Sequence, residues 1–118
     1  MTPRRSWLVL ALLVGLGGAA RADALADARI FIGMQLELIK AGDVDGVRAG
    51  MTDRLRDKVT GEALAQAKQR LAGVTIDDLV AAAVAKGTAV SVKTKAGRTL
   101  TTLVQVAGKW KADTLWFK

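Results

Sequence analysis

The chain contains no cysteine, no histidine and no tyrosine among its 118 residues, and it has a single proline. Without cysteine it forms no disulfide and offers no thiolate, and without cysteine or histidine it lacks the usual ligands of zinc. Without histidine it also lacks the most common general base, and a Ser-His-Asp triad is impossible. Glycine-rich phosphate motifs are absent as well. We therefore predict a protein that is not an enzyme and that binds neither a metal nor a cofactor.

Carboxylates are the remaining candidates for chemistry. Asp43 and Asp45 precede Gly46 as in a calcium-binding loop, but the later ligands and the terminal glutamate of such a loop are missing. We therefore expect Asp43 to cap a helix instead. Asp113 is the only acid after residue 85, and we expect it to pair with Arg98 or with a neighbouring lysine. A general base at Asp113 in a closed pocket is the less favoured alternative.

Residues 1–22 have the pattern of a signal peptide. A basic start with paired arginines at 4–5 is followed by an apolar run at 7–16, and a small-x-small pattern ends at Ala22. We expect cleavage after Ala22, with Ala24 as the alternative. The arginine pair leaves the twin-arginine route open, although the leucine-rich run favours the general secretory route. The pattern predicts a periplasmic or secreted protein with no stable membrane span after cleavage, because a span takes about 20 apolar residues.

The charge of the chain is uneven. Removing the three arginines of the predicted signal peptide from the 18 basic residues leaves 15 against 11 acidic ones, a net charge of +4. Residues 86–118 hold seven of these basic residues and one acid. The favoured interpretation is a solvated sheet face that prevents edge aggregation, and the alternative is a docking surface for an anionic partner or for membrane headgroups. Nucleic acid is not expected as that partner, since the protein is predicted to be exported. The basic surface patch would comprise Lys93, Lys95, Arg98, Lys109 and Lys111.

The first half of the mature chain has helical periodicity. We expect a helix at 24–41, capped by Asp23 and ended by Gly42, then a short helix from residue 44 to 51 and a third helix at 62–71. The residues expected on the buried face of the first helix are Leu25, Ala28, Phe31, Ile32, Leu36, Leu38 and Ile39.

The second half alternates between polar and apolar residues, as strands do. Residues 76–86 are ambiguous, because Thr75 and Asp78 resemble a capping box whereas Lys86-Gly87 suits a hairpin turn; we favour a strand there. In the last strand, Trp110 and Trp116 would share one face. The expected strands lie near 79–85, 88–95, 98–106 and 109–117, with a tight turn at Ala107-Gly108. Helices followed by such strands predict an α+β fold in which N-terminal helices pack on a curved antiparallel meander of about four strands.

Two short motifs suggest a family. Residues 40–43, Lys-Ala-Gly-Asp, end the first helix, and residues 108–113, Gly-Lys-Trp-Lys-Ala-Asp, close the meander. In this the chain resembles small exported bacterial proteins of the NTF2-like (cystatin-like cone) group. The resemblance implies a single domain over residues 23–118 with a pocket between sheet and helices. It implies no catalytic residue, because the tyrosine, histidine and paired aspartates of the catalytic members are not found here.

We therefore expect an exported, non-catalytic module that binds a small ligand or associates with a protein. The partner would be a small apolar ligand or another protein, and a homodimer is a further expectation, since domains of this fold often pair through the sheet. The alternative is an accessory module that docks an anionic partner through its basic sheet, and a more remote one is an isomerase- or hydrolase-like enzyme with a pocket carboxylate. The residues expected in the ligand pocket are Phe31, Leu100, Trp110, Asp113 and Trp116.

Overall fold

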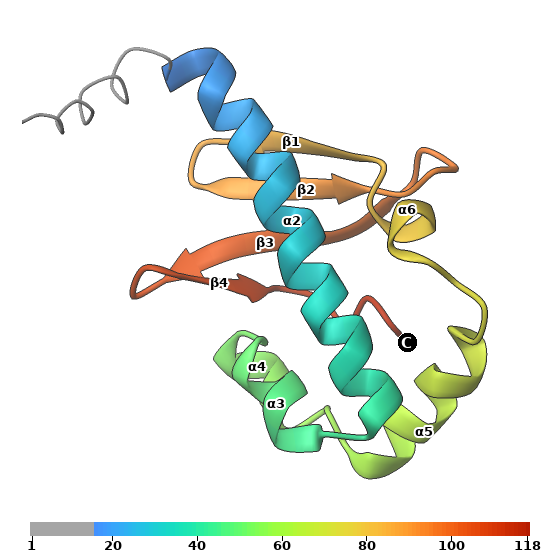
Figure 1. Cartoon of the computed structure of the whole chain (residues 1–118). Helices are drawn as coiled ribbons and strands as arrows, with labels where there is room; N and C mark the ends of the chain where they lie inside the picture. The colour runs from blue at the N-terminus through green and yellow to red at the C-terminus, as the bar shows by residue number, and fades with distance from the viewer. Residues whose placement is uncertain (1–15) are drawn as a thin grey trace, which may run out of the picture.

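The computed structural model describes residues 16–118, with side chains from residue 24 onward. In this part of the chain a long helix and several shorter ones precede a four-stranded antiparallel sheet with strand order β1-β2-β3-β4 (Figure 1). The predicted α+β arrangement is thus confirmed. The elements are α2 (Leu16–Ala41), α3 (Val44–Ala49), α4 (Asp53–Arg56), α5 (Gly61–Arg70), α6 (Ile76–Leu79), β1 (Ala82–Lys86), β2 (Ala89–Lys93), β3 (Thr99–Val106) and β4 (Lys109–Ala112).

Helix α2 buries the apolar stripe that its sequence predicts. Ala28, Ile32 and Ile39 are fully buried, and the helix ends at Gly42, whose φ of 71° suits glycine. The start was predicted wrongly. The helix begins at Leu16, so it runs through the expected cleavage point, and Asp23 lies inside it rather than capping it. Residues 1–15 of the predicted signal peptide lie outside the described residues.

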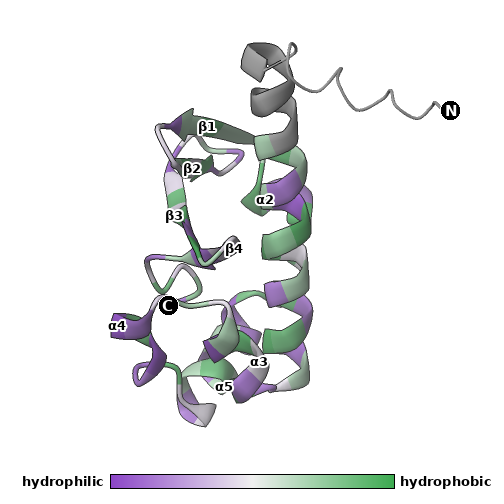
Figure 2. Cartoon of the chain, turned by 90° about the vertical axis from the view of Figure 1, so that its left-hand side faces the viewer, coloured by the Kyte–Doolittle hydropathy of each residue, from purple (hydrophilic) through white to green (hydrophobic). Residues whose placement is uncertain are grey.

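The sheet and α2 form two layers, and α3–α5 gather at the far end of α2 (Figure 2). Helix α2 contacts β1 and β2, and the side chains of the sheet that point towards it form the core with the buried stripe of α2. The buried residues of that inner face are Val90, Val92, Thr101, Leu103 and Ala112. Within a strand these residues are separated by one residue, as the alternation of a strand requires. Ser91, between the two valines, is also buried, on the opposite face.

The shorter helices complete the core. Asp43 caps α3, where its Oδ1 accepts a hydrogen bond from the Gly46 N–H at 2.9 Å, as predicted. Thr60 caps α5, and Leu64 and Ala67 of that helix are buried. Met51 follows α3 and forms a parallel bridge with Ala112 at the edge of β4. This bridge covers an edge that would otherwise present unpaired backbone groups.

The ambiguous segment 76–86 contains both structures. The capping box of Thr75 and Asp78 is present and starts α6, a single turn that ends at Leu79. Strand β1 begins only at Ala82, and the pairing of Lys86 with Ala89 places the turn at residues 87–88, one position later than predicted. The strand prediction was thus correct for the second half of the segment, whereas the capping box starts a helical turn in the first half.

The last strand is shorter than predicted. Strand β4 ends at Ala112, so Trp116 lies outside it and does not share a strand face with Trp110. The chain turns after Asp113, and the rings of Trp116 and Phe117 pack edge to face at 5.6 Å, both buried. Burial of these two large rings in the core stabilises the turned end more than continued strand pairing would, because a strand would leave one of them on each face.

Candidate functional site

A cleft of about 400 Å³ opens between the N-terminal part of α2 and the turn end of the sheet. Its roof comes from α2, its floor from the inner face of all four strands, and one end is closed by the β1–β2 turn. Segments far apart in the sequence therefore meet there. The lining residues are Ala24, Asp27, Ala85, Gly87, Thr88, Val90, Gln105 and Trp110.

Strand register explains the floor of the cleft. Ala85 pairs with Val90 across β1 and β2, and Gln105 pairs with Trp110 across β3 and β4. Residues that face each other in register share one side of a sheet. Both pairs therefore stand on the inner side, and the neighbouring Lys109 alternates to the outer side.

Trp110 and Asp27 carry the polar chemistry of the cleft. The indole Nε1 of Trp110 donates a hydrogen bond to Oδ2 of Asp27 at 3.4 Å, and both side chains are partly exposed. Asp27 is the only charged residue among those that line the cleft. The arrangement presents an aromatic ring, one carboxylate and small apolar surfaces to a molecule that enters.

Of the five residues predicted for a ligand pocket, the structure brings only Trp110 into this cleft. Phe31 and Leu100 are partly buried against the core, and Leu100 lies at the register shift near the start of β3, whereas Gln105 lies near its end. Trp116 is buried. The five residues are therefore not one site.

Asp113 belongs to a different cluster. Its carboxylate forms an ion pair with Arg54 at 3.2 Å and accepts a hydrogen bond from the Thr52 hydroxyl at 3.0 Å. The predicted pairing with Arg98 is wrong. It fails because β4 lies at the sheet edge next to the start of α4, whereas Arg98 lies in the β2–β3 turn.

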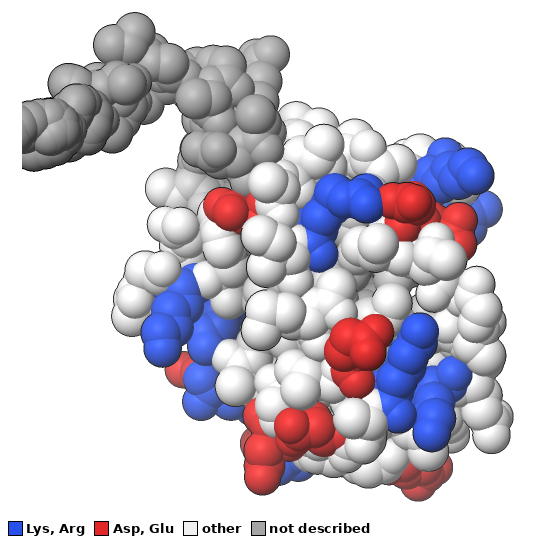
Figure 3. Space-filling model, viewed as in Figure 1, with Lys and Arg blue, Asp and Glu red and all other residues white. Residues whose placement is uncertain are grey.

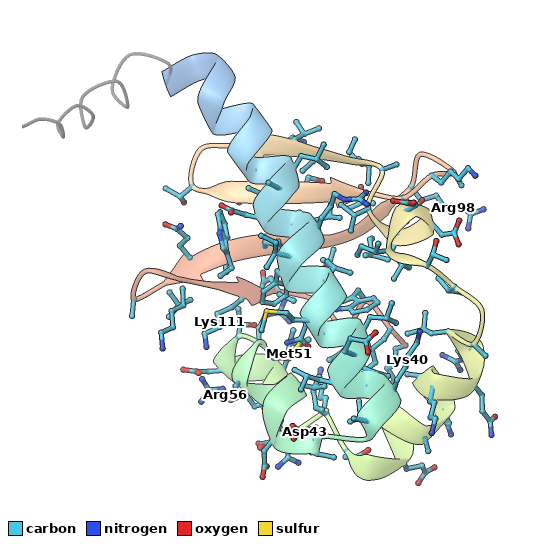
Figure 4. All side chains as sticks on the ribbon, in the orientation of Figure 1. Lys40, Asp43, Met51, Arg56, Arg98 and Lys111 are labelled. Carbon is cyan, nitrogen blue, oxygen red and sulfur yellow. The ribbon has the colours of Figure 1, made fainter. Side chains whose placement is uncertain are left out.

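The predicted basic patch is divided between two ends of the sheet. One group stands at the β2–β3 turn and the other on β4, and Figure 4 shows Arg98 and Lys111 on opposite sides of the molecule. Two of the lysines are also engaged: Nζ of Lys93 donates to the Thr99 hydroxyl at 2.6 Å, and Nζ of Lys111 donates to a backbone carbonyl of α3. The first group is Lys93, Lys95 and Arg98, and the second is Lys109 and Lys111.

A second concave surface, here called the α2 groove, has a volume of about 850 Å³ and runs along the outer side of α2. Ile30 and Met34 expose 63% and 61% of their surface there, which is unusual for side chains of this size on neighbouring turns. Figure 3 shows a largely uncharged area over this helix, bordered by charged side chains. Its lining residues are Arg29, Ile30, Gly33, Met34, Leu36, Glu37, Leu38, Lys40, Val74, Thr75 and Ile76.

Hydrogen bonds anchor the wall of the α2 groove opposite the helix. Arg29 donates to the Val80 carbonyl at 3.1 Å and pairs with Asp77, which ties α2 to α6. At the start of α6 the backbone N–H and the hydroxyl of Thr75 both donate to the Asp78 carboxylate. These two hydrogen bonds, with a smaller attraction from Lys95, hold the pKa of Asp78 below its ordinary value.

Sequence reasoning missed Asp27 and the exposed pair Ile30 and Met34. The pair was visible as two apolar residues four positions apart, outside the stripe assigned to the core. Asp27 gave a weaker signal, an acid beside the buried stripe, and its contact with Trp110 joins positions 83 residues apart. No local pattern contains that contact.

Comparisons of the chain with models of protein families, with curated proteins and with solved structures find no match. No cluster of three or more acidic side chains, arranged to hold a metal ion, occurs within the described residues. Within the same residues, every helix is too short or too polar to cross a bilayer.

Proposed function

We propose that the protein is an exported, non-catalytic binding module of the NTF2-like type that holds a small amphiphilic molecule in the cleft beneath α2. The observation that carries the proposal is the placement of Trp110 and Asp27 together in a cleft whose other walls are small and mostly apolar. Ligand sites typically combine a mostly apolar lining with a few polar groups, in volumes of about 300–1,000 Å³. Export rests on the signal-like pattern of residues 1–22.

Binding is favoured over catalysis by the surroundings of the carboxylates. Asp27 is the only titratable group among the cleft residues, so the cleft offers a single carboxylate and no nucleophile–base pair. Asp113, the alternative general base, is occupied by Arg54 and Thr52 outside the cleft. The alternative of an anionic partner on the basic sheet is weaker, since its five residues form two separate groups.

The experiment follows the indole N–H resonances of two tryptophans by NMR. The indole N–H of Trp110 is the reporter of the cleft, and that of Trp116, which lies in the core, is the internal reference. The protein is titrated with small amphiphiles that are cationic, neutral or anionic. We expect at least one class to shift the Trp110 resonance in a saturable way and to leave Trp116 in place.

Two variants of β1 provide the matched test. Ala85→Phe fills the cleft and should remove the shift, whereas Ala82→Phe lies an odd number of residues away, on the outer face of the same strand, and should preserve it. Both positions are exposed, so neither change should unfold the protein. The proposal fails if no class of compound shifts Trp110, or if Ala85→Phe binds as the unchanged protein does.

The α2 groove supports a second candidate function, association with a second copy of this chain. In an antiparallel pairing of two α2 helices about a twofold axis at Gly33, Arg29 faces Glu37 of the partner subunit, because each lies four residues from the axis. Opposite charges then meet twice, beside the exposed Ile30 and Met34. Such self-complementarity favours a dimer through α2 rather than through the sheet.

A further inference from the structure

We infer that the ligand of the cleft beneath α2 is a small organic cation with a compact apolar body. The inference rests on the proposed function, and it adds the charge and shape of the ligand. Three features of the cleft lead to it: the charge of its lining, the identity of its aromatic residue and the size of its apolar floor.

The charge of the lining is a single negative one. Asp27 is the only charged lining residue, and no lysine or arginine side chain described in the structure forms an ion pair with it. Arg29 is close in sequence but pairs with Asp77 on the other side of α2. Lys86 and Lys109 flank the lining in sequence, and strand alternation turns both to the outer face of the sheet. A cation in the cleft would thus meet an unneutralised carboxylate.

The aromatic residue is the one that best attracts cations. Tryptophan gives the strongest cation–π interaction of the aromatic side chains. The hydrogen bond from Nε1 of Trp110 to Asp27 holds the ring and the carboxylate at the same place. Both groups would therefore act on one positive centre, and an anion would be repelled by the carboxylate and disfavoured by the ring.

The floor of the cleft fits the rest of such a molecule. Ala24, Ala85 and Val90 offer small apolar surfaces, while Thr88 and Gln105 add neutral hydrogen-bonding groups. A volume of about 400 Å³ suits a compact body rather than a long chain. One carboxylate neutralises one charge, so the cleft selects a monocation.

The test compares two molecules of nearly the same shape, choline and its neutral isostere 3,3-dimethylbutan-1-ol. Each is titrated into the full protein at low salt, and the Trp110 indole N–H is followed by NMR. We expect choline to bind at least about tenfold more tightly than the neutral isostere, and added salt to weaken choline alone.

The variant Asp27→Asn keeps an acceptor for the Trp110 N–H and removes the charge. It should weaken the binding of choline by about tenfold and leave the binding of 3,3-dimethylbutan-1-ol unchanged. Trp110→Leu removes the reporter indole, so its choline binding is measured by isothermal titration calorimetry; it should be weaker than in the unchanged protein, by the same factor at low and at high salt. Equal binding of the two molecules, or an Asp27→Asn variant that keeps the full preference for choline, would overturn the inference. Binding of neutral or anionic compounds without binding of choline would also overturn the inference. In that case the proposed ligand-binding function stands. If no compound of any charge shifts Trp110, both fail.

Discussion

The cleft beneath α2 and the α2 groove lie on the two sides of one helix, and they are built in opposite ways. The groove is lined largely by neighbouring residues of α2 and by residues 74–76, and its exposed Ile30 and Met34 are apolar. The cleft joins the helix to residues from all four strands or their turns, and a carboxylate and an indole stand in it. One surface is thus suited to another protein surface, and the other to a small molecule with a charge.

The difference has a consequence for stability. The floor of the cleft continues directly into the core, since Val90 of the floor pairs with the buried Leu103. The exposed side chains of the groove contribute little to the core, because more than half of their surface faces solvent. Changes in the core beneath the cleft floor should therefore affect folding, and changes in the groove should affect association.

The largest expected effect tests this contrast directly. Leu103→Ala removes a side chain with 1% exposure beneath the cleft, and it should lower the free energy of unfolding by about 2–5 kcal/mol. Met34→Ala in the groove should change it by no more than about 0.5 kcal/mol. Urea denaturation at low protein concentration measures both. Similar losses in the two variants would show that the groove residue belongs to the core.

A smaller effect concerns association. Met34→Asp places a charge in the apolar centre of the proposed α2 pairing, and it should raise the dissociation constant of the dimer by about tenfold or more. Val106→Asp is the matched control, because Val106 is also exposed, at 48%, but stands on the outer face of the sheet. Sedimentation velocity measures the constants. If Val106→Asp abolishes the dimer and Met34→Asp does not, the dimer pairs through the sheet rather than through α2. If the unchanged protein stays monomeric, the self-association proposal is wrong.

The smallest expected effect is a pH dependence at the wall of the groove. The pKa of Asp78 is lowered in the folded protein by the hydrogen bonds from Thr75, so the stabilisation is complete above the unfolded-state pKa of about 4. It should be lost as the pH falls through the lower folded-state pKa. A carbon-detected NMR titration should place the Asp78 midpoint below that of an aspartate in a short peptide, and Thr75→Ala should raise it part of the way. A midpoint at the peptide value would contradict the cap.

Much of the fold could be predicted, because local rules decide it. The buried stripe of α2, the cap at Asp43, the helix capped by Thr60 and the turn at Ala107-Gly108 follow from periodicity, capping and turn chemistry. The turn is confirmed by positive φ angles of 54° and 79°. The predictions failed where a local pattern competed with burial. The alternation of the sequence continues to Phe117. In the structure, however, Trp116 and Phe117 are buried in the core, and β4 ends at Ala112.

The candidate sites divide in the same way. The sequence by itself determined the absence of the usual catalytic side chains, the helix–sheet order and the apolar pair of the α2 groove, since each is a property of composition or of spacing within one helix. The tertiary structure alone decided that Trp110 meets Asp27, that Asp113 pairs with Arg54 and that the lysines of the sheet separate. These pairings depend on strand register and on the path of α2 across the sheet. Both are set by how the whole core packs, so no short stretch of sequence contains them.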